Sequence, residues 1–190
     1  MQASAQRTKA PLIETLMQSP AGHAPFLHDS PDRAALAVAL SSLDFAEQRG
    51  EPARLAQALT HVAYCYHQVG MSAHRRWYLQ QALRFSAMLS AVDTSVDTLC
   101  ELAEASIDCT DDFDDETDGP RLAHKARDQA RDHVYEAARL ASRSADPQWE
   151  VTVLLRISDL LDQMGDHDDA VSLQRRALGL ISNGAVQPKR

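Results

Sequence analysis

The feature that most constrains this chain is a frame of small and large apolar residues that occurs twice with the same spacing. The first copy contains a glycine and an alanine twelve positions apart, Gly70 and Ala82, and the second contains Gly165 and Ala177 at the same separation. The preceding positions also match in order: Leu59, Val62, Ala63 and Tyr66 in the first copy, and Leu154, Ile157, Ser158 and Leu161 in the second. Steps of three and four residues mark one face of a helix. Each copy therefore predicts a helix, a turn at the glycine and a second helix.

A third and longer copy of this frame lies between the other two. Its apolar positions are Leu99, Leu102 and Ala103 in the first helix, and Ala130, Val134 and Ala137 in the second. The offset of 17 residues from Ala82 to Leu99 recurs from Ala137 to Leu154. The third copy lacks the turn glycine and carries about 15 extra residues, within the acidic stretch 108–120 that ends in Gly-Pro. We expect this stretch to form a loop, because Gly and Pro interrupt helices.

The composition supports helix throughout the chain. Of 190 residues, 44% are hydrophobic, and glycine and proline number only 7 and 8. We expect an all-α fold with one helical domain over residues 32–182, preceded by a proline-rich irregular arm (1–31) and followed by a short basic tail (183–190). The expected helix pairs are at about residues 52–91, 93–143 and 147–182, with residues 34–48 as a lone second helix of an incomplete first unit.

The pattern of these copies resembles the tetratricopeptide repeat. It combines a small residue followed three positions later by a large one, a glycine at the turn, and alanines in the second helix. The resemblance implies antiparallel helix pairs stacked as a short right-handed superhelix of about seven helices. Three features depart from the family pattern: Arg75 stands where an alanine is preferred, the middle copy lacks the turn glycine, and the spacing exceeds the usual 34 residues. A helical bundle with coincidental spacing is the alternative.

In this family a peptide lies on the concave face, which is lined by first-helix residues that point away from the core. In register, the resemblance implies a peptide-binding site made of Thr60, His61, Tyr64, His67, Glu101, Glu104, Arg156, Asp159 and Asp162. Further lining positions are Gln57, Gln68, Asp97, Cys100, Asp108, Thr152 and Gln163. Acidic residues outnumber basic ones in this set, in which Arg156 is the one Lys or Arg, so we expect a negative groove that takes a basic or neutral segment. The groove lacks the Lys/Asn clamp that chaperone-binding members use for an acidic tail.

The charge balance limits the partners. The net charge is −8, which repels nucleic-acid phosphates, so we expect a protein or peptide partner. Two simpler interpretations of the acidic face stay open. The face could be merely solvated, or its charge could be answered inside the fold by basic residues of the following helix. These are Arg121, Lys125, Arg127 and Arg131.

Motifs for catalysis or metal binding are weak. Asp114, Glu116 and Asp118 mimic an EF-hand loop, but Lys125 occupies the place of its bidentate glutamate. A helical row of one histidine and two acids could hold a metal, and a solvated helix face explains it equally well. This row is His124, Asp128 and Asp132, with His133 beside it. We therefore expect no catalytic residue, no metal and no cofactor, and a metal-dependent enzyme is the least favoured class.

The cysteines and the lengths of the apolar runs indicate in which cellular compartment the protein is expected. The three cysteines form no CxxC pair and are expected to be free, as in a reducing compartment. No apolar run is long enough for a signal peptide core or a membrane span, so a cytoplasmic protein without membrane association is expected. The preferred function is a non-catalytic interaction module, either an adaptor or a regulatory sensor. The alternative is a self-associating structural module that forms a homodimer through the outer face of its last helix, at Leu173, Leu180 and Ile181.

Overall fold

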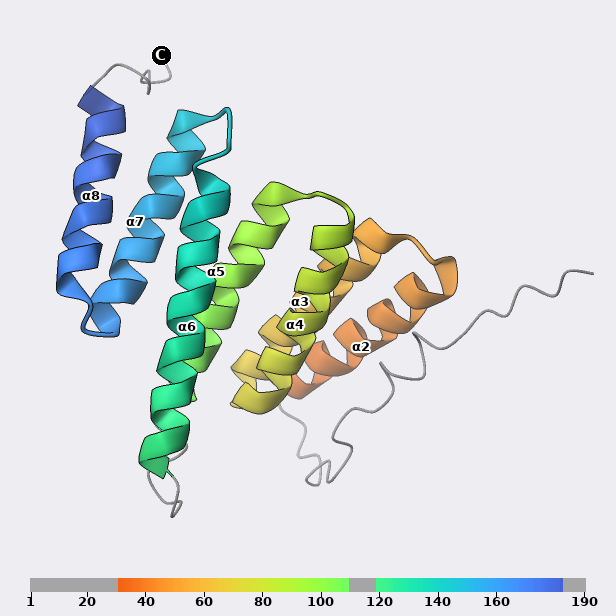
Figure 1. The fold of residues 1–190 in the computed structure, drawn as a ribbon. Coiled ribbons are helices and arrows are strands. Elements are labelled where there is room, and N and C mark those ends of the chain that lie inside the picture. Colours follow the sequence, from red (N-terminus) through yellow and green to blue (C-terminus); the bar gives the residue numbers. More distant parts are fainter. Residues whose placement is uncertain (1–30, 110–118, 183–190) are drawn as a thin grey trace, which may run out of the picture. The chain divides into compact units, whose positions relative to one another are not determined.

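The computed structural model describes residues 31–109 and 119–182, and all of its regular structure in this part is helical (Figure 1). The helices are α2 (Pro31–Arg49), α3 (Pro52–Gln68), α4 (Ser72–Met88), α5 (Val92–Asp108), α6 (Gly119–Ala141), α7 (Pro147–Gln163) and α8 (His167–Ser182). The predicted all-α class is confirmed. Most of the predicted arm 1–31, most of the acidic loop and the tail 183–190 lie outside the described residues. None of the described helices is both long enough and apolar enough to cross a bilayer.

The helices pack in sequence order as pairs, and every connection between successive helices except the one from α5 to α6 is a short turn. The most extensive contacts join α3 to α4, α5 to α6 and α7 to α8, while α2 packs on α3 and the pairs meet through α4 with α5 and α6 with α7 (Figure 1). Helices joined by such short turns are antiparallel neighbours. In addition α5 contacts α7 directly, so the first helices of two successive pairs are adjacent. The predicted stack of antiparallel pairs is confirmed, while its right-handed twist stays a prediction.

The core consists of the residues of the repeated frame. Leu59, Val62, Ala63 and Ala82 are buried together with residues of α2, α4 and α5. The equivalent positions around Leu154 and the six apolar positions of the middle copy are buried as well. Small residues at the second-helix positions let the paired helices approach closely, and larger side chains fill the space between them. The spacing seen in the sequence is therefore a packing register.

The turns explain why glycine recurs in two of the copies. Gly70 and Gly165 adopt positive φ angles of 72° and 86°, which glycine reaches without steric cost. In each turn, the backbone N–H of the next residue donates to a carbonyl of the preceding helix, as in a Schellman motif. The turn between α4 and α5 has the same hydrogen bonds, with Ala91 N donating to Ser86 O at 3.1 Å, but here Ser90 holds the left-handed position with φ of 54°.

Replacing Ser90 with glycine should therefore raise the free energy of unfolding by about 0.5 kcal/mol, because a left-handed conformation costs a residue with a Cβ atom more than it costs glycine. Urea unfolding followed by circular dichroism measures this difference. Ser42→Gly is the control, because Ser42 lies inside α2 and is exposed. There, glycine should destabilise the protein. A loss of stability in both variants would contradict the assignment of strain to Ser90.

Candidate functional site

A surface depression of about 600 Å³ lies between the first helices of the three pairs. Its lining comes from α3 (Gln57, Thr60, His61, Tyr64), α5 (Thr94, Asp97, Thr98, Glu101) and α7 (Arg156). The α3 residues recur every three or four positions, so they share one face of that helix, and the core residues Leu59, Val62 and Ala63 occupy the other side. The structure thus brings together five of the nine predicted site residues. These are Thr60, His61, Tyr64, Glu101 and Arg156.

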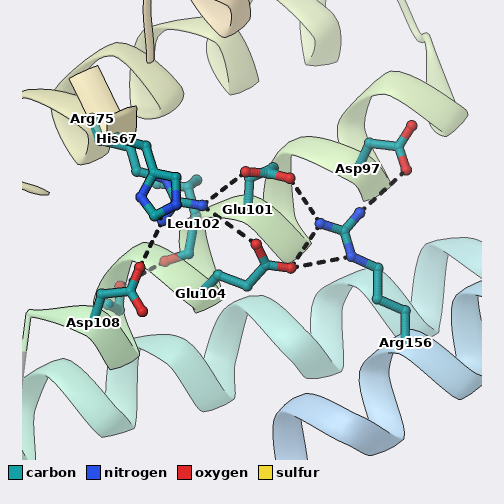
Figure 2. Close-up of polar contacts among 9 residues, drawn as sticks. His67, Arg75, Asp97, Glu101, Leu102, Glu104, Asp108 and Arg156 are labelled. Carbon is teal, nitrogen blue, oxygen red and sulfur yellow. Dashed lines mark hydrogen bonds and ion pairs between the residues drawn. The ribbon is translucent and has the colours of Figure 1, made fainter. Parts of the chain in front are cut away.

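Two glutamates of α5 form an ionic network with Arg75 and Arg156 at the depression (Figure 2). Oε2 of Glu101 accepts a hydrogen bond from Arg75 Nη2 at 2.9 Å, and Oε1 accepts one from Arg156 Nη2 at 2.8 Å. Glu104 bridges the same two arginines, with Oε2 at 3.3 Å from Arg75 Nη2 and Oε1 at 2.8 Å from Arg156 Nη2. All four carboxylate oxygens are therefore engaged by guanidinium groups.

Arg75 is the member of this ionic network that the sequence analysis did not place. It lies on α4, is only 4% exposed, and reaches α5 from the neighbouring second helix. Its Nη1 donates to Asp108 Oδ2 at 2.7 Å and lies 3.3 Å from His67 Nδ1 (Figure 2). The departure from the repeat pattern was the available signal. An arginine at a position that prefers a small residue, preceding a long stretch without any lysine or arginine, indicates an internal partner for that stretch.

The predicted negative charge of the groove is partly neutralised from within. Arg75 and Arg156 face four carboxylates, those of Asp97, Glu101, Glu104 and Asp108, which leaves a formal charge of −2. The basic residues of α6 that could have supplied this compensation do not supply it among the described residues. Arg131 pairs with Asp128 and Asp166. Arg121, Lys125 and Arg127 form no ion pair with any residue in the described part of the chain. The counter-charges come from α4 and α7 because these helices, and not α6 alone, pack against α5.

Burial and charge shift the acid–base equilibria at this site. Burial favours the neutral form of Glu101, but the hydrogen bonds from Arg75 and Arg156 outweigh it, so the pKa of Glu101 is lowered from its ordinary 4.5. Burial raises the pKa of Asp97, and the attraction of Arg156 does not offset this. Burial also raises the pKa of the Cys100 thiol to about 12. Cys100 is 1% exposed and does not line the surface as predicted.

The remaining predicted residues lie away from the depression. Asp159 is exposed on α7, and Asp162 is exposed and paired with His167. His67 is exposed beside Arg75, and Glu104 belongs to the network beneath the site. None of these four residues lines the depression. The depression therefore includes residues within 57–64 of α3, residues within 94–101 of α5 and Arg156 of α7, and it does not extend to these four positions.

The residues considered for metal binding do not assemble. His124 Nδ1 lies 2.9 Å from Asp128 Oδ2, but Asp128 is also held by Arg131. Across residues 31–109 and 119–182, no group of three or more histidine, cysteine, aspartate or glutamate side chains could hold a metal ion. Asp114, Glu116 and Asp118 of the EF-hand-like stretch lie outside the described residues.

A scan against known protein families finds no match for this chain, and a search of the curated proteins finds none either.

Proposed function

We propose that this chain is a non-catalytic protein-interaction module of the tetratricopeptide type that binds an extended segment of a partner protein in the depression between α3, α5 and α7. The observation that carries the proposal is the convergence of five residues, chosen from the sequence register alone, around this one concave site. Concave sites formed between repeated helices are typical binding surfaces of helical-repeat proteins.

The chemistry of the lining favours a neutral or basic segment. Hydroxyl groups of Thr60, Tyr64 and Thr94 and the amide of Gln57 can exchange hydrogen bonds with a peptide backbone. The residual charge of −2 in the ionic network attracts cations and repels phosphates. Cys65 and Cys100 are buried and form no disulfide, which fits a reducing compartment such as the cytoplasm.

Peptide selection from a random library, followed by mapping of amide chemical shifts in the labelled full chain, tests this function. Selected peptides should shift the amide signals of residues 57–64 and 94–101. Tyr64→Ala should weaken binding about tenfold, because Tyr64 is exposed at the site and supplies its aromatic surface. Tyr135→Ala is the matched control, since Tyr135 is exposed on α6 and does not line the depression. Peptides that map to another surface would contradict the proposal.

A second candidate function is self-association through α8. Val171, Leu178 and Ile181 are exposed along this last helix, and Leu178 is 61% exposed. Leu173 and Leu180, which were expected on the outer face, are instead partly buried against Leu154 and Ala177. The apolar stripe is therefore shifted around the helix, and Ile181 stays part of it. Sedimentation at high concentration decides the matter: a dimer that Leu178→Glu dissociates supports this function, and a monomer excludes it.

A further inference from the structure

The carboxylates near the depression differ in how many hydrogen bonds they already accept from arginine side chains. Both oxygens of Glu101 and of Glu104 accept hydrogen bonds from guanidinium groups. The nearest cation to Asp97 is Arg156 Nη1, which is 3.8 Å from Oδ1 and beyond hydrogen-bond distance. The side chain of Asp97 is 65% exposed, and no side chain in the described residues donates a hydrogen bond to it. Asp97 is therefore the carboxylate in the depression that is ready to accept a donor from a partner.

The depression also carries an exposed aromatic ring. Tyr64 lies on α3, is 58% exposed and lines the same depression as Asp97 on α5. The face of an aromatic ring attracts cations, and a carboxylate forms charge-assisted hydrogen bonds with them. A carboxylate and an aromatic ring that line one concave site together match the two faces of a basic side chain, especially the flat guanidinium group of arginine.

Arg156 limits how much positive charge the depression accepts. Its guanidinium group already occupies the oxygens of Glu101 and Glu104 that face α7. A second cation from the partner would lie close to Arg156, which repels it, and the oxygens of Glu101 and Glu104 already accept hydrogen bonds. The net charge of −2 is shared between Asp97 and the distant end of the network at Asp108. The depression therefore offers one position for a cation and not a row of them.

We propose that the depression is a subsite for a single arginine side chain of the partner segment, held by the Asp97 carboxylate and the Tyr64 ring, with neutral residues on either side. This inference rests on the proposed function and sharpens it. The partner is a segment with an isolated arginine, and a polybasic tract gains nothing from its additional charges at this site.

The test uses blocked five-residue peptides whose central residue is either arginine or its neutral isostere citrulline, flanked by alanines. Each peptide is titrated into the isotope-labelled full chain, and binding is followed by amide chemical shifts. The arginine peptide should shift signals of residues 57–64 and 94–101 and should bind about tenfold more tightly than the citrulline peptide. Asp97→Asn should abolish this difference. Asp132→Asn, an exposed acid on α6, should preserve it.

Several outcomes would overturn the subsite. If the arginine and citrulline peptides bind the wild-type chain equally well, the subsite does not exist. The subsite is also refuted if Asp97→Asn keeps the full preference for the arginine peptide. A peptide with three consecutive arginines that binds far more tightly than the single-arginine peptide would refute the limit set by Arg156. If library-selected peptides map to the depression but ignore the replacement of arginine by citrulline, the subsite fails and the proposed function stands. If no peptide maps there, the proposed function itself fails.

Discussion

Replacing Arg75 with methionine should lower the free energy of unfolding by about 3 kcal/mol, because the variant leaves carboxylates of α5 without their buried counter-charge. Arg75 is 4% exposed and serves Glu101, Glu104 and Asp108 at once. These partners are themselves partly solvated, which keeps the loss towards the lower end of that expected for a broken buried network. Urea unfolding near neutral pH measures it. Arg84→Met is the control, because Arg84 is exposed on the same helix and, among the described residues, its side chain bonds only to Gln81.

The penalty of Arg75→Met should also depend on pH. In the folded wild-type protein the pKa of Glu101 is lowered from 4.5, so its contribution to stability is fully present above this value and is lost as the pH falls through the folded pKa. The difference between the two proteins should therefore be largest near neutral pH and shrink below pH 4.5. A difference that stays constant over this range would show that Arg75 acts through packing and not through charge.

Leu102→Ala should cost about 3 kcal/mol for a different reason, the cavity left in a closely packed core. Leu102 is fully buried on α5 and packs with residues of the preceding helices. Leu178→Ala removes the same atoms from an exposed position on α8 and should change stability by less than about 0.5 kcal/mol. Parallel thermal unfolding of both variants measures the contrast. Similar losses in the two variants would mean that the repeated frame does not define the core.

The fold could be predicted because helix periodicity and tight-turn chemistry are local properties. The equivalence of Leu59 with Leu154, and of Gly70 with Gly165, already placed the helices, the turns and the buried positions. Ser90 was not predicted, because serine carries no strong signal for the left-handed conformation that it adopts. Hydrogen bonds from the neighbouring helix ends hold it there.

The site could be predicted only in part, because side-chain pairing depends on which helices meet. The register placed Thr60, His61 and Tyr64 on the concave side, and these residues line the depression. The register alone did not pair Arg75 with α5, since that contact joins a second helix to the first helix of the next pair, and only the arginine's departure from the repeat pattern pointed to it. Long basic side chains can reach from one helix to the next. Which acid they pair with depends on how the two helices pack, and sequence spacing does not show this.

The ionic network also has a consequence for how the chain unfolds. Stacked helix pairs ordinarily gain stability from their nearest neighbours, so the ends of an array can unzip while its middle persists. Here Arg75 belongs to the first pair, Glu101 and Glu104 to the second, and Arg156 to the third. Melting either outer pair must break charge contacts with the middle one, so we expect the three pairs to unfold in a single cooperative transition. A segment bound across α3, α5 and α7 would strengthen the same coupling.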